Sequence, residues 1–284
     1  MRLVSFVQDG RESYGVVRGN DLYPVRLDHL KNIPDLKAAI TGERIADLNR
    51  YCEETAVPLS QVALLPPIPN PGKIICAGMN YCKPYPVEGV APPDPDNVVI
   101  FARHAETLVG HGTPLEMPRG EAAKSFDFEG EIVAVIGRRG RFIAQDDALG
   151  HVMGYSIMNE GSVRGWMTHS VHAGKNFHAS GSWGPWITTA DEIGDPASLE
   201  LRTHLNGKLM QSAIAEEMIF GLSDLIAYIS NLLPLNPGDI IATGSPDGTG
   251  GSRKPPAFLK AGDCVEVTVS GIGTLKNHVG AASY

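Results

Sequence analysis

Two glutamates at alternate positions of one expected strand are the residues of this chain best suited to chemistry. The segment 126–137 reads Phe-Asp-Phe-Glu-Gly-Glu-Ile-Val-Ala-Val-Ile-Gly. Side chains alternate between the two faces of a strand, so Glu129 and Glu131 point the same way. Apolar residues continue on both faces up to Ile136, which is typical of a strand covered on both sides. Buried carboxylates need a counter-charge or a metal ion, so the pattern predicts a metal site; the alternative is an edge strand with two solvated glutamates.

A third carboxylate follows a second apolar strand. Glu160 comes after the strand expected at 154–158 and before a helix expected at 162–170, so regular backbone on both sides would hold it rigidly. Taken alone, an acid at a helix start is also common because it complements the helix dipole. Three carboxylates suit Mg²⁺ or Mn²⁺, with Ca²⁺ as a further candidate, whereas zinc more often takes His or Cys.

Two further polar residues lie next to expected turns or loops. One follows a glycine, and the other lies where a strand meets a loop. Lys175 follows a glycine and could meet an anionic substrate, although a lone lysine beside glycine is usually solvated. Thr243 follows the apolar run 240–242. Its hydroxyl and the next backbone N–H groups could hold a carboxylate, whereas a structural Ser/Thr turn is the commoner explanation.

The elements that must position these residues divide at a proline-rich linker near residue 68. Residues 1–68 predict a small N-terminal α/β domain, and residues 69–284 predict the catalytic domain. The elements expected in the first domain are strands at 1–7 and 14–17 and a helical segment at 33–51 that breaks near Gly42.

In the second domain, a strand at 73–78 runs into a loop, and the segment 80–97 is too rich in proline for regular structure. This loop predicts a mobile cover over the site, with a plain connector as the alternative. An apolar helix is expected at 222–233 and a last strand pair after residue 263.

Composition narrows the class of protein. The chain has 284 residues and a formal charge of −8 with no basic run, which argues against nucleic-acid binding and favours small-molecule chemistry. Its four cysteines form no C-x-x-C pair, and we find neither a signal peptide nor an apolar run that could span a bilayer. The expectation is a protein of the reducing cytoplasm without membrane partners. Nucleotide-binding and serine-hydrolase motifs are lacking.

Together these segments resemble the fumarylacetoacetate hydrolase family, in its small bacterial form with a short N-terminal domain. The resemblance runs from about residue 73 to residue 279. The motifs that carry it are Lys-Ile-Ile-Cys-Ala-Gly-Met-Asn-Tyr at 73–81, Phe-Glu-Gly-Glu at 128–131, Asn-Glu-Gly-Ser-Val-Arg at 159–164, Gly-Lys-Asn-Phe at 174–177, Gly-Pro-Trp at 184–186, Pro-Gly-Asp at 237–239 and Thr-Gly-Ser-Pro at 243–246.

The resemblance implies an α+β fold, a mixed β-sheet roll with flanking helices, commonly as a homodimer. It implies that the three glutamates hold Mg²⁺ or Mn²⁺ and that Lys175 is a catalytic residue on the substrate side. It also implies a 2-oxo acid or 1,3-diketo acid substrate, such as an acylpyruvate, that reacts through a metal-stabilised enolate. The further substrate contacts that it suggests are Tyr81, Arg164 and Thr243.

One departure from the family pattern concerns the base. Hydrolytic members carry a lid histidine where this chain has Pro84, and Glu88 lies one residue beyond the usual partner acid. A missing general base costs about 10²–10⁴-fold. The first reading is a hydrolase of C–C bonds that uses Glu88, His104 or another base. The second is a decarboxylase, tautomerase, isomerase or dehydratase, and the third is a degenerate protein that only binds a 2-oxo acid.

Overall fold

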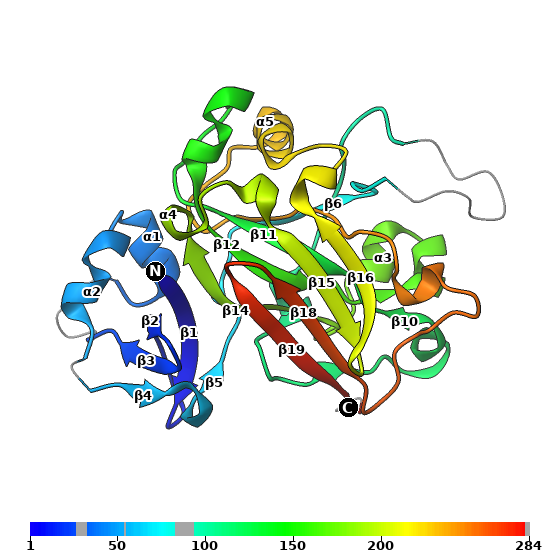
Figure 1. Ribbon diagram of the computed structural model, residues 1–284, viewed down its shortest axis with the longest axis horizontal. Helices are drawn as coiled ribbons and strands as arrows, with labels where there is room; N and C mark the ends of the chain where they lie inside the picture. Colours follow the sequence, from blue (N-terminus) through cyan, green and yellow to red (C-terminus); the bar gives the residue numbers. More distant parts are fainter. Residues whose placement is uncertain (27–32, 54, 83–93, 282–284) are drawn as a thin grey trace.

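A large mixed β-sheet runs through most of the chain (Figure 1). The computed structural model describes residues 1–26, 33–53, 55–82 and 94–281. The strands of this sheet are β1 (Arg2–Gln8), β2 (Arg11–Arg18), β3 (Asp21–Pro24), β4 (Val57–Pro58), β5 (Ala63–Leu64), β6 (Ile74–Gly78), β7 (Val99–Ala102), β8 (Leu108–Val109), β11 (Gly130–Ile136), β12 (Val152–Asn159), β14 (Gly181–Thr189) and β17 (Ile240–Ala242).

The main path of the sheet is β4-β3-β2-β1-β14-β12-β11-β17-β6-β7, and β5 and β8 pair with β1 and β14. Neighbours are antiparallel except for β17 with β6 and β14 with β8, which are parallel. The sheet is therefore mixed, and β11 lies in its interior between β12 and β17.

A second sheet of order β16-β15-β18-β19-β9 crosses in front of β11 and β12 in Figure 1. Its strands are β9 (Leu115–Glu116), β15 (Glu200–Leu205), β16 (Lys208–Ile214), β18 (Cys264–Val269) and β19 (Gly273–Gly280). A separate short ladder joins β10 (Phe126–Asp127) to β13 (Ser162–Val163). The expected mixed-sheet roll of α+β type is confirmed.

The helices are short and lie around the sheets. The α-helices are α1 (Leu36–Thr41), α2 (Leu48–Tyr51), α3 (Val171–Lys175), α4 (Ala190–Ile193) and α5 (Leu222–Leu232). The 3₁₀ segments are η1 (Ile45–Asp47), η2 (Leu59–Gln61), η3 (Ala105–Thr107), η4 (Gly120–Ser125), η5 (Gln145–His151), η6 (Arg164–Thr168), η7 (Pro196–Ser198), η8 (Ala215–Glu217) and η9 (Gly250–Ser252). Among the described residues, we find no helix long and apolar enough to cross a bilayer.

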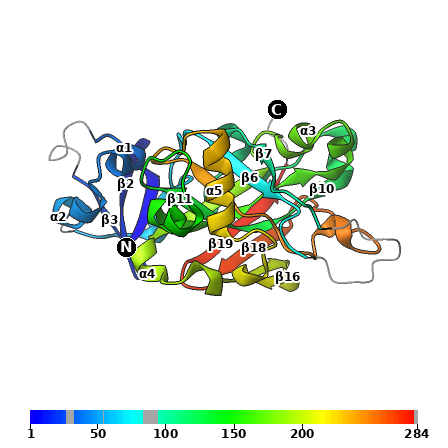
Figure 2. The ribbon, with the colours of Figure 1, turned by 90° about the horizontal axis from the view of Figure 1, so that it is seen from above.

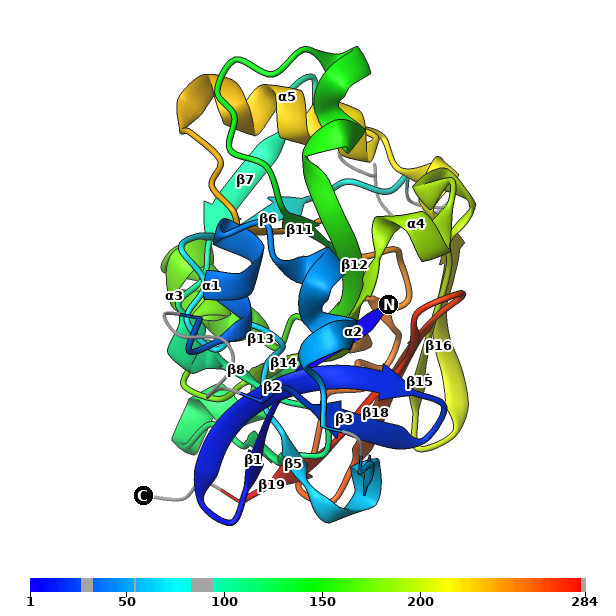
Figure 3. The same cartoon turned by 90° about the vertical axis from the view of Figure 1, so that its left-hand side faces the viewer.

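Strand β11 is covered on both faces, as the sequence predicts. Ile132 and Ala134 belong to the core shared with the second sheet, which includes Val267 of β18. Val133 and Val135 belong to a different core, which includes residues of α1 and β1. Figure 3, seen from the N-terminal side, shows α1 and α2 on the near side of the molecule. The residues that follow Glu131 therefore have no exposed face.

The N-terminal strands continue the large sheet. Strand β1 pairs with β14 through Arg2 with Thr188 and Leu3 with Ile187. Ser5 Oγ donates a hydrogen bond of 2.7 Å to the carbonyl of Pro67. Figure 2 shows β1 to β3 with α1 and α2 at one end of the molecule and α3 at the other. The domain boundary at residue 68 stays a prediction, since the sheet itself is not interrupted between the two regions.

The helix expected at 162–170 is wrong. Ser162 and Val163 pair instead with Asp127 and Phe126 as a short ladder, and η6 follows. The next α-helix starts only after Ser170, whose side chain accepts a hydrogen bond from the Ala173 N–H at 3.0 Å. Ser170 is an N-cap, so it marks a helix start where the sequence pattern suggested a helix end.

A half-buried histidine away from the carboxylates, His111, predicts a pH dependence of stability. His111 Nδ1 accepts from the Lys276 N–H at 3.2 Å. Burial, with the charge of Lys276, lowers the pKa of His111 below its usual value. The folded state therefore favours neutral His111, so this stabilisation is present above the ordinary histidine pKa and is lost as pH falls below it. We expect acidification to lower the Tm of wild type more than that of His111→Asn, by on the order of 2 °C.

Circular-dichroism melts of the two proteins from neutral to mildly acidic pH check this expectation. Asparagine is the matched replacement because its Oδ1 can still accept from the Lys276 N–H but cannot titrate. Identical pH profiles of the Tm would contradict it.

Candidate metal centre

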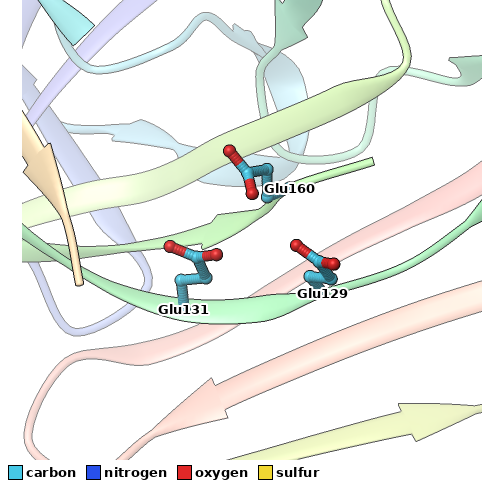
Figure 4. Close-up of side chains that lie close together, drawn as sticks. All are labelled: Glu129, Glu131 and Glu160. Carbon is cyan, nitrogen blue, oxygen red and sulfur yellow. The ribbon is translucent and has the colours of Figure 1, made fainter. Parts of the chain in front are cut away.

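Three buried carboxylates converge at the ends of two neighbouring strands. Glu131 lies in β11, Glu129 directly precedes it, and Glu160 follows β12. Figure 4 shows Glu129 and Glu131 directed from one strand toward Glu160. One oxygen from each carboxylate lies within 4.8 Å of the others, and the residues are at most 6% exposed. The structure thus brings the three predicted ligands together.

The pairing of β11 with β12 produces this convergence. Glu131 stands opposite Met158, and Gly130 opposite Asn159, so the chain leaves both strands at the same edge. The Glu160 N–H donates to the Glu129 carbonyl at 2.7 Å, which ties the two ligand-bearing segments directly to each other.

Glu129 is held as an anion by two cations. The Lys175 ammonium contacts its Oε2, and Arg164 Nη2 lies 2.5 Å from its Oε1. Burial by itself would raise the pKa of Glu129, but Lys175 and Arg164 together lower it to about 2. Lys175 Nζ also lies 2.5 Å from Glu160 Oε2, so one ammonium bridges two carboxylates.

Glu131 has different electrostatic surroundings from the other two glutamates. Its Oε2 accepts from the Gly244 N–H at 2.9 Å, and no ion pair to it is recorded within the described residues. Burial raises its pKa well above the usual value, and the charges of Glu160 and Glu129 raise it further. The charge of Lys175 lowers this pKa only in part, so Glu131 is the least compensated of the three carboxylates.

Glu160 also carries an unused ligand atom. Its Oε1 is buried without a hydrogen-bond partner within the described ranges, and Arg103 Nη1 lies 3.8 Å from it. A buried free carboxylate oxygen beside a poorly compensated carboxylate is an arrangement that a hard dication would complete. The residues present therefore fit Mg²⁺ or Mn²⁺, with Glu129, Glu131 and Glu160 as the ligands.

Tight packing brings Lys175 to the carboxylates. Lys175 ends α3, and a Cβ on the preceding Gly174 would lie 2.3 Å from Met167 Cγ, so glycine lets α3 pack closely against η6. Burial of Lys175 opposes its charge, but Glu129 and Glu160 raise its pKa above the usual value. It is an ammonium ion inside the site and not the solvated lysine of the alternative.

Arg164 is anchored by an acid that the sequence interpretation missed. Its Nε lies 2.7 Å from Asp127 Oδ2, and Asp127 also accepts from the N–H groups of Gly250 and Gly251 at 2.8 and 2.9 Å. Asp127 is fully buried. It links the arginine to the glycine-rich loop, and its place two residues before Glu129 was the available signal.

The hydroxyl groups of Tyr81 and Thr243 differ in their hydrogen bonding. Tyr81 lines the cavity, and its buried hydroxyl has no hydrogen-bond partner in the described part of the chain. Burial raises the pKa of this phenol, so it stays protonated. The Thr243 hydroxyl instead donates to the Ile132 carbonyl at 3.0 Å. The carboxylate contact expected near Thr243 is made by the Gly244 N–H, and its partner is Glu131.

The two candidate bases are not brought to the centre. Glu88, like Pro84 and most of the expected cover, lies outside the described residues. His104 is exposed, and its ring packs edge-on against the His172 ring with 5.3 Å between the centroids. His104 does not line the cavity that contains the carboxylates.

A cavity of about 260 Å³ opens above the centre. Its base is formed by the three glutamates with Arg164 and Lys175, and one wall is apolar, with Met79, Val99, Phe101, Met167 and Val171. The polar residues of its rim that sequence reasoning missed are Ser245, Asp247, Thr249 and Ser252. Ser245 belongs to the Thr-Gly-Ser-Pro motif and the other three follow it, so the motif was their available signal. Such a cavity suits a small anionic ligand with an apolar portion.

Comparison with known proteins identifies the class of protein that this fold and site define. A model of the Fumarylacetoacetate (FAA) hydrolase C-terminal family matches residues 73–280, and an Rv2993c-like, N-terminal model matches residues 1–67. The chain therefore belongs to the fumarylacetoacetate hydrolase family of enzymes.

Among its curated relatives is the mitochondrial oxaloacetate tautomerase fahd2 of Xenopus laevis, 40% identical over 224 residues that cover 78% of this chain and 69% of that protein. Oxaloacetate tautomerase YisK of Bacillus subtilis is 38% identical over 226 residues, or 78% and 74% of the two chains.

Two solved structures are similar over nearly the whole chain. Fumarylacetoacetate hydrolase from Exiguobacterium antarcticum has a TM-score of 0.84 at 32% identity and 99% coverage of both chains. Maleylpyruvate hydrolase from Sphingobium sp. SYK-6, solved with manganese (II) ion and pyruvate, has a TM-score of 0.80 at 27% identity and 100% coverage of both.

Proposed function

We propose that this protein is a divalent-metal-dependent tautomerase that interconverts the keto and enol forms of a small 2-oxo acid of the oxaloacetate type. The observation that carries the proposal is the group of three buried carboxylates beside Lys175 at the base of a small cavity. The similarity to relatives named oxaloacetate tautomerases supports this choice of reaction.

Keto–enol tautomerisation only moves a proton within the substrate. One C–H bond next to the 2-oxo carbon breaks and one O–H bond forms on the oxo oxygen, so water is not consumed and no group leaves. A bound Mg²⁺ or Mn²⁺ would supply Lewis-acid polarisation of the oxo group. The cavity lining contains no histidine among the described residues, which suits a reaction without an activated water molecule.

The chain's own residues can hold the substrate. Lys175 Nζ and the Arg164 guanidinium are cations at the cavity base, so they can bind a carboxylate or a developing oxyanion. Tyr81 lines the same cavity and its phenol is held protonated, so its hydroxyl can donate a hydrogen bond to the oxo oxygen. The apolar wall limits access of water to the reacting carbon.

Hydrolysis of a C–C bond is the second candidate. It is the first reading of the sequence, and the similarity to maleylpyruvate hydrolase supports it. It requires a base for water, and Pro84 occupies the position of the family's lid histidine. The homodimer and the cytoplasmic location stay predictions of the sequence.

The decisive experiment follows oxaloacetate and acetylpyruvate by NMR in deuterated water with Mg²⁺ or Mn²⁺ and the purified protein. We expect metal-dependent acceleration of deuterium exchange and of enol–keto interconversion, both abolished by EDTA. Metal-dependent formation of acetate and pyruvate from acetylpyruvate would establish a hydrolase instead. Loss of CO₂ would mean decarboxylation, and no reaction with either substrate would favour a binding protein.

Pro84→His is expected to raise the hydrolysis of acetylpyruvate. A histidine at this position supplies the type of base that hydrolytic family members use, and a general base contributes about 10²–10⁴-fold. Pyruvate release, measured with a coupled lactate dehydrogenase assay, reports the change, with Pro84→Ala as the matched control. If Pro84→His gives no more pyruvate than Pro84→Ala, the missing histidine does not limit hydrolysis.

A further inference from the structure

A fully buried arginine lies directly behind the carboxylate centre. Arg103 follows β7, and its side chain is 0% exposed. Its Nε donates to Thr107 Oγ1 at 3.1 Å, its Nη1 to the Gly161 carbonyl at 2.9 Å, and its Nη2 to Ser180 Oγ at 3.2 Å. Each guanidinium nitrogen thus has a partner, which fixes the orientation of the group.

These contacts surround the segment that carries Glu160. Gly161 is the next residue, and a Cβ on it would lie 1.8 Å from the Ser180 carbonyl oxygen, so the two segments touch through their backbones. Arg103 contacts both segments at this point. Arg103 therefore fixes the main chain next to Glu160, directly after the end of β12.

Arg103 also faces the unused oxygen of Glu160. Nη1, which donates to the Gly161 carbonyl, lies 3.8 Å from Glu160 Oε1. At this distance it supplies positive charge without a direct hydrogen bond, so the oxygen keeps its lone pairs available. A direct bond would have occupied the atom that a metal ion needs.

We propose that Arg103 is a positioning residue of the metal centre. Its guanidinium holds Glu160 Oε1 in place through the backbone at Gly161 and stabilises the carboxylate's charge while leaving the ligand atom free. The inference rests on the metal centre and does not depend on which reaction the centre performs. Lysine cannot replace the arginine, because its ammonium is a point charge that cannot reach Thr107, Gly161 and Ser180 together.

The test measures Mn²⁺ binding to wild type, Arg103→Lys and Arg103→Met through the EPR signal of the free ion. Loss of groups that orient metal ligands typically weakens binding by about 10–100-fold, and we expect a weakening of this size in both variants. Because the charge alone does not suffice, Arg103→Lys should not recover wild-type affinity. The EPR spectrum of the bound ion should also change.

Lys73→Met is the control for a merely structural role. Lys73 forms another ion pair with a buried partner, 2.5 Å from Asp239 Oδ2. We expect Lys73→Met and the Arg103 variants to lower the Tm of the metal-free protein, but only the Arg103 variants to weaken Mn²⁺ binding. Equal weakening in Lys73→Met would overturn the inference, because general destabilisation would then explain the loss.

A milder variant keeps the test decisive if both Arg103 variants fail to fold. Ser180→Ala removes one of the three hydrogen-bond partners of Arg103 and should weaken Mn²⁺ binding severalfold. Wild-type affinity in Arg103→Lys, or in Ser180→Ala when it is the variant that folds, overturns the proposal. If wild type itself binds no Mn²⁺, both the metal centre and this inference are wrong, whereas failure of tautomerase activity with intact Mn²⁺ binding contradicts only the proposed function.

Discussion

Glu131→Gln is expected to abolish metal binding and, at the same time, to stabilise the metal-free protein. Glu131 is buried with two other carboxylates nearby and no recorded ion pair in the described structure. Glutamine has the same shape and can still accept from the Gly244 N–H, but it removes a carboxyl group whose ionisation is opposed by burial and by the charges of Glu160 and Glu129. Stability lost to a binding site is commonly recovered when the site is removed. We expect the Tm to rise by on the order of 2–4 °C.

The activity of Glu131→Gln should fall by roughly 10³-fold or more, because Lewis-acid stabilisation worth several kcal/mol is lost with the metal. Calorimetric melts with EDTA and with Mn²⁺, together with metal analysis, measure both effects. Glu129→Gln is the matched control, since it should also lose the metal but should lower the metal-free Tm by breaking the contacts with Lys175 and Arg164. If Glu131→Gln still binds Mn²⁺, the assignment of Glu131 as a metal ligand is wrong.

Lys175→Met is expected to lower the Tm of the metal-free protein, which is opposite to the effect of Glu131→Gln. Its ammonium bridges Glu129 and Glu160 inside the protein, and removing one partner of a buried ion pair typically costs about 3–5 kcal/mol. The metal-free variant should therefore melt well below wild type. Mn²⁺ can supply the missing positive charge, so it should raise the Tm of Lys175→Met more than that of wild type. Catalysis should stay low, because the metal does not replace the contact that we propose between the lysine and the substrate.

Thermal melts of Lys175→Met over a Mn²⁺ titration, with activity measured at saturation, test these points. Lys124→Met is a suitable control because Lys124 pairs with Glu121 at 2.7 Å on the surface, with both side chains at least 71% exposed. Exposed pairs contribute about 0–1 kcal/mol, so this variant should behave like wild type. Wild-type activity in Lys175→Met would refute its catalytic role, and an unchanged metal-free Tm would refute the bridging contact.

The sequence by itself determined the local features of the centre. Strand alternation placed Glu129 and Glu131 on one side, and the unbroken apolar run to Ile136 indicated burial on both faces, which the two cores on either side of β11 confirm. A strong period-two pattern is readable because it depends only on neighbouring residues. Motif order also led to the correct family.

The tertiary structure alone decided which charges meet. Arg103 and Asp127 were missed because their partners, Gly161 and Arg164, lie on distant segments, and burial of their polar groups is decided by strand pairing and not by local pattern. The same holds for Thr243, whose hydroxyl is used by the neighbouring strand. Periodicity along the chain predicts which face of a strand a side chain occupies. Its charged partner is set by the packing of segments that are distant in the sequence, and no local pattern predicts that packing.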